Sequence, residues 1–245
     1  MTIEPELINR LASAKRVTVL TGAGVSVESG VPTFRDAQTG LWAKFKPEDL
    51  ATPQAFRRNP RLVWEWYEWR RKLVAEARPN SAHLALAEME ARFPDFCLIT
   101  QNVDGLHQQG GSRKVIELHG NIMRTKCFDE GSIVASWQQS GDVPPKCPNC
   151  GGLLRPDVVW FDEPLPEVAI KMANEASEAC DVFLSVGTST VVYPAAGLPE
   201  KALRAGAAII EINPEPTPLT KRVHFSIQAP AGVALPAILH ALGGK

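Results

Sequence analysis

The stretch VTVLTGAG, residues 17–24, decides the fold. Residues 17–20 form a short apolar run rich in β-branched side chains, which is typical of a strand buried on both faces of a parallel sheet. The residues that follow, Thr21-Gly22-Ala23-Gly24, place two glycines where the chain must turn, and glycine lets backbone N–H groups approach phosphate oxygens. The usual dinucleotide fingerprint has a third glycine three positions after Gly24, where this chain has Val27. On this loop alone, a plain strand-to-helix turn and a phosphate site are equally favoured.

Four more runs of this kind lie farther along the chain, at residues 96–99, 115–118, 182–186 and 208–212. Helical patterns lie between them at residues 81–92, 167–179 and 194–204, the first with Ser81 as the expected N-cap. Short buried strands that alternate with helices predict the α/β class, with a doubly wound parallel sheet.

Two stretches interrupt the alternation. Residues 33–77 have patterns for two or more helices where a crossover needs one, and residues 123–154 are rich in Gly and Pro and contain a cysteine cluster. We therefore expect a single domain over residues 1–245 with two lobes. The large lobe comprises residues 1–32, 78–122 and 155–245, and the insertions 33–77 and 123–154 form the smaller lobe.

The composition restricts the partners. Lys plus Arg (26) nearly equals Asp plus Glu (27), which gives a formal net charge of -1. We therefore expect no specific nucleic-acid partner and no membrane partner. No apolar run is long enough to span a bilayer. Residues 1–16 have the pattern of a short amphipathic helix and not of a signal peptide, so a cytoplasmic location is the default expectation.

Small and polar residues follow three more of the predicted strands. These segments are Thr100-Gln101-Asn102-Val103-Asp104, Gly187-Thr188-Ser189 and Asn213-Pro214-Glu215. In open α/β sheets, ligands bind outside the carboxyl ends of the strands. Side chains such as Asp104 and Ser189 also cap helices and begin loops, so each end alone has a structural explanation. These three ends and the glycine loop, which follows a fourth strand, together favour a ligand site without identifying the ligand.

Taken together, these motifs resemble the sirtuins, the NAD-dependent protein-lysine deacylases. The resemblance covers TGAGVSVESGVPTFR at residues 21–35, TQNVDGLH at 100–107, His119-Gly120, GTS at 187–189 with VYPA at 192–195, and Asn213 with Glu215. The motifs occur in the family's order and span nearly the whole chain. The resemblance implies a Rossmann-type large lobe and a small zinc-carrying lobe, with NAD and an acyl-lysine protein substrate bound between them.

The resemblance also implies which residues meet NAD. The glycine loop would lie at the pyrophosphate, and residues 34–35 on a mobile loop over the cofactor. Residues 101–104 would hold nicotinamide and its ribose, and the other two strand ends would meet phosphate and ribose oxygens. The full set is Gly22, Ala23, Gly24, Ser26, Pro32, Phe34, Arg35, Gln101, Asn102, Asp104, Gly187, Thr188, Ser189, Asn213 and Glu215.

His119 is the expected general base. In this family the acyl oxygen attacks the nicotinamide ribose, nicotinamide leaves, and a ribose hydroxyl must lose a proton before O-acyl-ADP-ribose is released. An imidazole suits this proton transfer because its unperturbed pKa lies near neutrality. His119 follows the predicted strand at 115–118 and precedes Gly120, so the backbone can bend into the cleft. A lone histidine at a strand end is more often structural, and only the resemblance favours the base.

Tyr67 and Arg70 are expected to recognise the acyl group. They are three residues apart in a helical pattern at 63–74, so they share a face. The pattern alone favours a core aromatic beside a solvated arginine. The pair is similar to the one that marks the class III branch of sirtuins, which favours succinyl-, malonyl- and glutaryl-lysine, and the small Ala37 supports this branch. An arginine fork binds a carboxylate bidentately. We expect removal of both acidic acyl and acetyl groups, with a plain deacetylase as the alternative.

The peptide is expected to pair as a strand with residues 158–161, where Val158 and Phe161 are the expected substrate-binding residues. The second peptide-binding loop is expected at residues 187–193. After Phe161 the family usually has glycine, and this chain has Asp162. This departure bears on the local backbone geometry.

Three of the five cysteines suggest zinc. Cys147-Pro148-Asn149-Cys150 is a C-x-x-C knuckle, which fits two corners of a tetrahedral site. Cys127 lies upstream, but the residue three positions later is Glu130, so only three cysteine ligands are visible. Glu130, a histidine or water would complete the shell, and a lobe without metal is the rival interpretation. Cys97 and Cys180 lie in apolar surroundings and are expected in the core.

Three other functions compete with deacylation. An NAD-dependent oxidoreductase would use the same sheet and recycle its cofactor. A non-catalytic binding module is disfavoured by the presence of His119, Asn102 and Asp104. Mono-ADP-ribosyl transfer shares the NAD chemistry, and the sequence leaves it open as a side activity.

Overall fold

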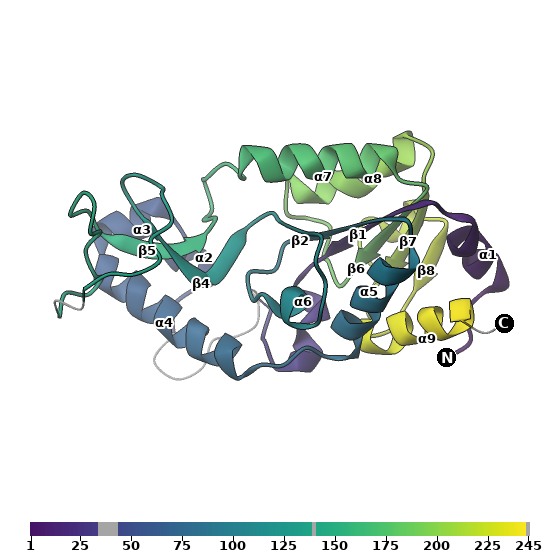
Figure 1. The fold of residues 1–245 in the computed structure, drawn as a ribbon, viewed down its shortest axis with the longest axis horizontal. Coiled ribbons are helices and arrows are strands. Elements are labelled where there is room, and N and C mark those ends of the chain that lie inside the picture. The colour runs from purple at the N-terminus through teal and green to yellow at the C-terminus, as the bar shows by residue number, and fades with distance from the viewer. Residues whose placement is uncertain (34–43, 139–140, 244–245) are drawn as a thin grey trace.

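The computed structural model describes residues 1–33, 44–138 and 141–243. Its main sheet has six strands, all parallel, in the order β3-β2-β1-β6-β7-β8 (Figure 1). Counted along the chain, this is the 3-2-1-4-5-6 order of the Rossmann fold, whose ligand crevice opens between the first and fourth strands, here β1 and β6. The predicted α/β class and doubly wound sheet are confirmed. The strands are β1 (Arg16–Thr21), β2 (Asp95–Thr100), β3 (Val115–Glu117), β6 (Val182–Val186), β7 (Ala208–Ile212) and β8 (Phe225–Ile227).

Helices cover both faces of this sheet (Figure 1). α1 (Pro5–Ser13), α5 (Ser81–Arg92) and α9 (Ala231–Gly243) contribute to the core on one face, and α7 (Glu167–Ala179) and α8 (Leu198–Arg204) to the core on the other. Successive strand residues alternate between the two cores, as Phe183 and Leu184 do. Full burial of such a side chain contributes about 1.5–3 kcal/mol. Packing in the two cores therefore fixes the position of the sheet, and with it the positions of the carboxyl ends of its strands.

Two helix starts differ from the sequence-based expectation. The N-cap of α5 is Asn80 and not Ser81, because the Asn80 side chain accepts hydrogen bonds from the N–H groups of Ala82 and His83. The segment expected as one helix over residues 194–204 begins with a short 3-10 turn, Ala195–Gly197, before α8.

A second, two-stranded sheet lies at the end of the molecule opposite the termini (Figure 1). Its antiparallel strands β4 (Gly120–Cys127) and β5 (Leu154–Val158) are accompanied by α2 (Pro47–Leu50), α3 (Pro53–Arg58) and α4 (Pro60–Glu76). The expected lobe borders at 122/123 and 154/155 fall inside these two strands, and the division at those positions stays a prediction. Local sequence explains where α3 and α4 begin. The side chain of Thr52 caps α3 and that of Asn59 caps α4, and each helix has a proline near its start.

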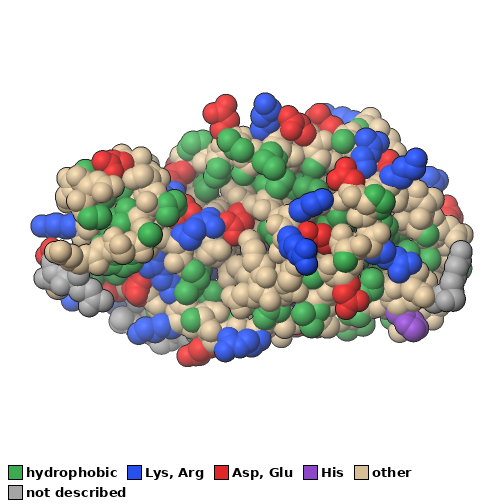
Figure 2. All heavy atoms as spheres, viewed as in Figure 1, with side chains coloured by type: hydrophobic (Ala, Val, Ile, Leu, Met, Phe, Trp, Pro, Cys, Tyr) green, Lys and Arg blue, Asp and Glu red, His purple; other side chains and the backbone are tan. Residues whose placement is uncertain are grey.

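The surface carries no large field of one sign on the face that Figure 2 shows, where acidic and basic side chains are interspersed. None of the helices in the described ranges is long and apolar enough to cross a membrane.

Candidate functional site

The glycine loop after β1 packs directly on the loop after β6. The N–H groups of Gly22 and Gly24 donate to the carbonyl oxygens of Val186 and Gly187, at 3.1 and 2.9 Å. A Cβ atom on either glycine would lie 2.8 Å from the Gly187 oxygen, which is too close for any side chain. These two glycines are therefore required by loop-to-loop packing, and their own N–H groups are engaged within the protein. The chain continues into short 3-10 turns, the first at Ala23–Val25.

A buried polar cluster joins the glycine loop to the loop after β2. Ser26 Oγ donates to Asp104 Oδ2 at 2.7 Å, and Asn102 Nδ2 donates to Ser26 Oγ at 3.1 Å. All three side chains are buried. Asp104 Oδ1 also accepts from the N–H of Leu106 at 2.9 Å, at the start of α6 (Leu106–Gln109). Asp104 thus accepts a backbone N–H next to Gly105, the N-cap of α6, and it also lies among the expected ligand residues.

His119 lies at the junction of the two sheets and is held through one ring nitrogen. Its Nδ1 is 2.9 Å from the carbonyl oxygen of Gln101. A carbonyl oxygen only accepts, so Nδ1 carries the hydrogen and Nε2 of the neutral ring keeps its lone pair. Burial lowers the pKa of His119 below its ordinary value, while the hydrogen bond to Gln101 acts in the opposite direction. The Gln101 side chain continues the chain of contacts and donates to Thr188 Oγ1 at 3.2 Å.

The remaining expected cofactor residues lie at the ends of β6 and β7. Thr188 is buried and Ser189 is exposed. Asn213 Nδ2 donates to the backbone oxygen of Glu215 at 2.6 Å, and the Glu215 side chain is exposed. Because β6 and β7 are paired, these ends lie side by side at the edge where β1 and β2 also end. Pro32 is exposed, while Phe34, Arg35 and Ala37 fall outside the described residues.

Tyr67 and Arg70 lie on α4, and Tyr67 belongs to the hydrophobic core that α4 shares with the two-stranded sheet. Tyr67 is 2% exposed, and its hydroxyl oxygen accepts a hydrogen bond from Trp160 Nε1 at 2.9 Å. Burial raises the pKa of Tyr67 to about 12, against the nearby charge of Arg70, which lowers it. The Arg70 guanidinium carbon lies 5.1 Å from the centroid of the Trp66 ring, and burial lowers the Arg70 pKa. Arg70 is half-buried, so its exposure lies between that of the solvated arginine that the pattern alone favoured and that of a buried one.

The expected peptide-pairing strand follows β5 and is tied to His119. The N–H of Val159 donates to the His119 carbonyl at 2.9 Å. Of the two expected substrate residues, the Val158 side chain is buried in the core beneath α4, whereas Phe161 is 42% exposed. Asp162 has a φ of 67°, the left-handed conformation that favours glycine. The departure from glycine therefore falls on a position where glycine is the less strained residue.

Sequence reasoning missed the buried arginine that organises this strand. The Arg155 guanidinium donates to the Val158 carbonyl at 2.7 Å and to Glu163 Oε2 at 2.9 Å, and it lies over the Trp160 ring. It also missed a pair of buried histidines, His83 and His107, whose ring centroids are 4.8 Å apart. No periodicity signals such contacts, because they join residues from separate elements.

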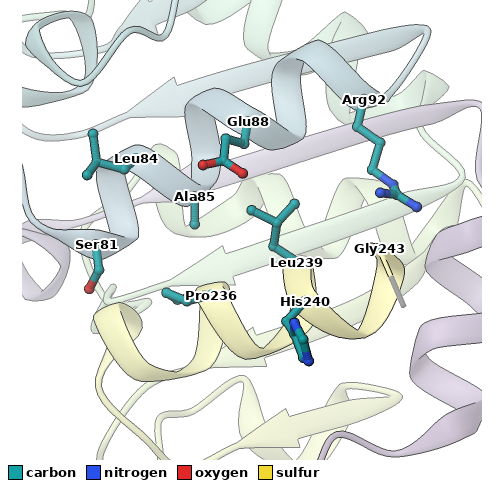
Figure 3. A pocket seen from close by; sticks show the side chains of 9 residues that line it. All are labelled: Ser81, Leu84, Ala85, Glu88, Arg92, Pro236, Leu239, His240 and Gly243. Carbon is teal, nitrogen blue, oxygen red and sulfur yellow. The ribbon is translucent and has the colours of Figure 1, made fainter. Parts of the chain in front are cut away.

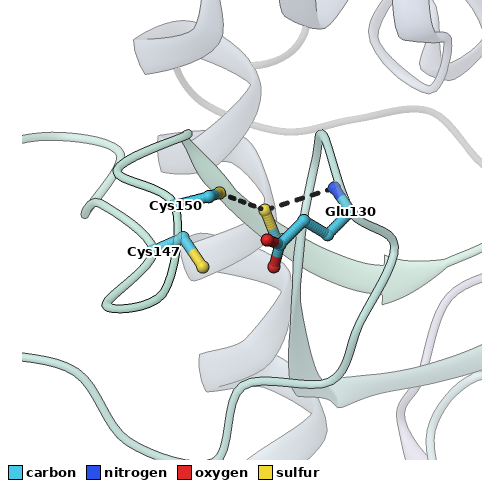
Figure 4. A group of neighbouring side chains, drawn as sticks. Glu130, Cys147 and Cys150 are labelled. Atoms are coloured by element: carbon cyan, nitrogen blue, oxygen red, sulfur yellow. Dashed lines mark hydrogen bonds between the residues drawn. The ribbon is translucent and has the colours of Figure 1, made fainter.

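The cysteine cluster is assembled as the sequence suggested. Cys127, Glu130, Cys147 and Cys150 each offer one ligand atom, and these atoms lie within 4.8 Å of one another. Figure 4 shows the Glu130 carboxylate pointing to the sulfurs. Backbone N–H groups of Cys150 and Asn149 lower the pKa of the Cys147 thiol, which favours the thiolate that a metal binds. Three sulfurs and one carboxylate are a donor set that fits zinc. Cys180 lies in the core as expected, and Cys97 is partly buried against it.

The described cavities lie away from the strand ends. A groove of about 590 Å³ runs between α5 and α9, with Leu84, Pro236 and Leu239 along it and Arg92 and His240 near one end (Figure 3). A smaller one, about 300 Å³, is lined by Phe56, Phe128 and Gly152 near the cysteine cluster.

Comparison with known proteins identifies the family. The Sir2 family profile matches residues 22–194. An NAD-dependent protein deacylase of Aquifex aeolicus is 57% identical over 220 residues, which cover 89% of this chain and 92% of that protein. One of Ralstonia nicotianae is 56% identical over 230 residues, 94% of this chain and 93% of that protein. Among solved structures, a Sir2 homolog–NAD complex superposes with a TM-score of 0.92 at 45% identity, covering 99% of this chain and 94% of the other. Sir2 bound to acetylated peptide gives 0.87 at 28% identity, with both chains fully covered. The chain belongs to the Sir2 family.

Proposed function

We propose that this protein is an NAD-dependent protein-lysine deacylase. The names of its relatives and the NAD and acetylated-peptide complexes of its structural neighbours support this activity. The observation that carries the proposal is the hydrogen bond from His119 Nδ1 to the Gln101 carbonyl, which leaves Nε2 as a proton acceptor at the junction of the two sheets.

The residues around the carboxyl ends of β1, β2, β6 and β7 fit NAD as cosubstrate. The side chains of Ser26, Asn102 and Asp104 are buried and polar, which suits hydroxyl and amide groups. When bound there, NAD would supply an electrophilic ribose carbon for the acyl oxygen, with nicotinamide as the leaving group. We assign the nicotinamide side to Gln101, Asn102 and Asp104, and the adenosine side to Asn213 and Glu215.

His119 acts as the base in this proposal. Burial lowers its pKa, which favours the neutral imidazole that accepts a proton at Nε2 from a ribose hydroxyl. Two contacts hold the residue in place. Gln101 binds the ring, and the Val159 N–H binds the backbone carbonyl. The second contact ties the base to the segment that is proposed to pair with the peptide.

Tyr67 and Arg70 are proposed to select acyl groups that end in a carboxylate. Arg70 is half-buried beside the Trp66 ring, so its charge is partly stripped of water. The guanidinium fork of Arg70 can bind a carboxylate bidentately, whereas a neutral acetyl group offers it no charge. A plain deacetylase remains the competing function, supported by the acetylated peptide bound in a structural neighbour.

A comparison of succinyl-, malonyl- and acetyl-lysine peptides tests both levels of the proposal. Each peptide is incubated with NAD, and free nicotinamide and deacylated peptide are measured together. A deacylase releases nicotinamide only when an acyl-lysine peptide is present. An oxidoreductase would instead reduce NAD and leave the acyl group in place. Higher kcat/KM on the succinyl and malonyl peptides supports the acidic preference, and equal or lower values refute it.

A cytoplasmic location is a further part of the proposal. All five cysteines are free thiols in the structure, which is usual in a reducing compartment.

A further inference from the structure

Two short turns present the cysteine cluster, and they have the same backbone hydrogen bonds. In the first turn, residues 127–132, the Gly131 N–H donates to the Cys127 carbonyl at 3.0 Å and the Cys127 N–H donates to the Ser132 carbonyl at 2.9 Å. In the second turn, residues 147–152, the Gly151 N–H donates to the Cys147 carbonyl at 2.9 Å and the Cys147 N–H donates to the Gly152 carbonyl at 2.7 Å.

The correspondence extends to conformation and burial. The fifth residue of each turn is a glycine with positive φ, 69° at Gly131 and 75° at Gly151. The first residue of each turn is a buried cysteine, and the fourth residue is exposed. Because the two turns correspond in backbone hydrogen bonds, glycine conformation and burial, Glu130 occupies the position in the first turn that Cys150 occupies in the second.

The backbone contacts to the cysteine sulfurs also correspond between the two turns. The Glu130 N–H donates to Cys127 Sγ at 3.5 Å. In the second turn, the backbone N–H of Cys150 makes the corresponding hydrogen bond to the Cys147 sulfur. In both turns, the N–H of the fourth residue therefore contacts the sulfur of the first. Figure 4 shows this N–H contact in the first turn and the Glu130 carboxylate turned toward the cluster.

We propose that Glu130 is the fourth ligand of a mixed zinc site made of Cys127, Cys147, Cys150 and one Glu130 carboxylate oxygen. Tetrahedral zinc with Zn–S bonds of about 2.3 Å needs sulfurs about 3.8 Å apart. Cys127 Sγ and Cys150 Sγ are already 3.5 Å apart, and all four ligand atoms lie within 4.8 Å. Small side-chain rotations therefore close the site around a metal.

The neighbouring carboxylate is not equivalent. Asp129 is the third residue of the first turn, and its carboxylate lies against Gly152 and outside the group of converging ligand atoms. Asp129→Asn is therefore a matched control, since it removes a carboxylate next to the cluster without removing the proposed ligand.

One oxygen in place of a fourth sulfur changes which metals the site prefers. Carboxylate oxygen is a harder donor than thiolate. The preference for cadmium over zinc is therefore expected to be weaker than in Glu130→Cys, which would restore four sulfurs.

Cobalt(II) substitution of the full-length protein tests the ligand directly. The metal-free protein is titrated with cobalt(II), and the thiolate-to-cobalt absorption is recorded before zinc displaces the cobalt. The wild type is expected to show about three-quarters of the charge-transfer intensity of Glu130→Cys, as three thiolates compare with four. Glu130→Ala is expected to weaken zinc binding at least about tenfold, and Asp129→Asn to leave affinity and spectrum unchanged.

Three results would overturn the proposal. One is a Glu130→Ala protein that keeps the wild-type zinc affinity and cobalt spectrum. Another is a Glu130→Cys protein whose charge-transfer intensity equals that of the wild type. The third is a wild-type protein that binds neither cobalt nor zinc. Glu130 is exposed, and circular dichroism of each variant with and without metal separates ligand loss from misfolding.

Discussion

The indole N–H of Trp160 donates to the hydroxyl oxygen of Tyr67, with Nε1 and Oη 2.9 Å apart. Both side chains are 2% exposed. Because Trp160 occupies an acceptor position of the hydroxyl, the Tyr67 proton is free to be donated to another group. This arrangement suits the proposed role of Tyr67 as a donor to an acyl carboxylate, and it makes the pair a structural link between α4 and the segment after β5.

Tyr67→Phe is expected to destabilise the protein by about 1–3 kcal/mol, because it leaves the buried Trp160 N–H without its acceptor. Chemical denaturation measures the loss. In a Trp160→Phe background the same change is expected to cost clearly less, since the donor is already absent. Equal costs in both backgrounds would show that the hydrogen bond is not what Tyr67 contributes.

Arg70→Met is expected to lower kcat/KM for a succinyl-lysine peptide by about 10- to 100-fold, the value of a charge-assisted hydrogen bond, and to change the acetyl-lysine value far less. Arg61→Met is the matched control, because Arg61 lies on the same helix and forms an exposed ion pair with Glu65. Equal losses on the two substrates would refute a role of Arg70 in binding the carboxylate.

The buried histidine pair is expected to make folding stability depend on pH. Burial lowers the pKa of His107 to about 3, and it also lowers the pKa of His83. As the pH falls below the unfolded value of about 6.5, the unfolded chain takes up a proton on His107 and the folded one does not, so stability is lost by about 1.4 kcal/mol per pH unit from this residue. The lowered pKa of His83 acts in the same direction. Stability from this source is fully present above pH 6.5.

His107→Gln tests this prediction through the slope of unfolding free energy against pH between about pH 6 and 5. The slope is expected to be smaller than that of the wild type by the contribution of one bound proton, about 1.4 kcal/mol per pH unit. This difference does not depend on the variant's absolute stability. His240→Gln, which removes a histidine at an exposed position, serves as the control. An unchanged slope in His107→Gln would contradict the prediction.

Asp162→Gly is expected to stabilise the protein by about 0.5–1 kcal/mol, because glycine adopts the φ of 67° without strain. Asp162→Ala is expected to be less stable than the wild type, since alanine lacks the local hydrogen bonding that lets aspartate tolerate this conformation. Thermal or chemical unfolding of the three proteins gives the order, and a glycine variant less stable than the alanine variant would contradict it.

The sequence was sufficient for most of the main sheet. Strands buried on both faces must be apolar and favour β-branched residues, so five of the six were visible as short runs. β8 was not predicted, because Phe225–Ile227 is only three residues long and has a polar residue at its centre. The antiparallel strands β4 and β5 were also hidden, since each mixes charged and apolar residues.

The candidate site could be located by sequence but not assembled. Parallel strands bring their carboxyl ends to one edge, so the strand pattern alone places Asn102 and Thr188 together. Side-chain contacts between distant elements could not be found in this way. The contact between Trp160 and Tyr67, for example, joins residues 93 positions apart and leaves no local pattern. The close packing of Gly22 on Gly187 likewise depends on how two loops meet, and the sequence alone suggested a different use for that glycine.

The proposed role of His119 is tested most directly by deacylation with His119→Ala. Succinyl-lysine peptide and NAD are mixed with wild-type or variant protein, and the deacylated peptide is measured by mass spectrometry, with circular dichroism to confirm the fold. We expect rapid deacylation by the wild type and none above background by the folded variant, because the variant lacks the proposed acceptor of the ribose proton. Deacylation by His119→Ala at the wild-type rate would contradict it.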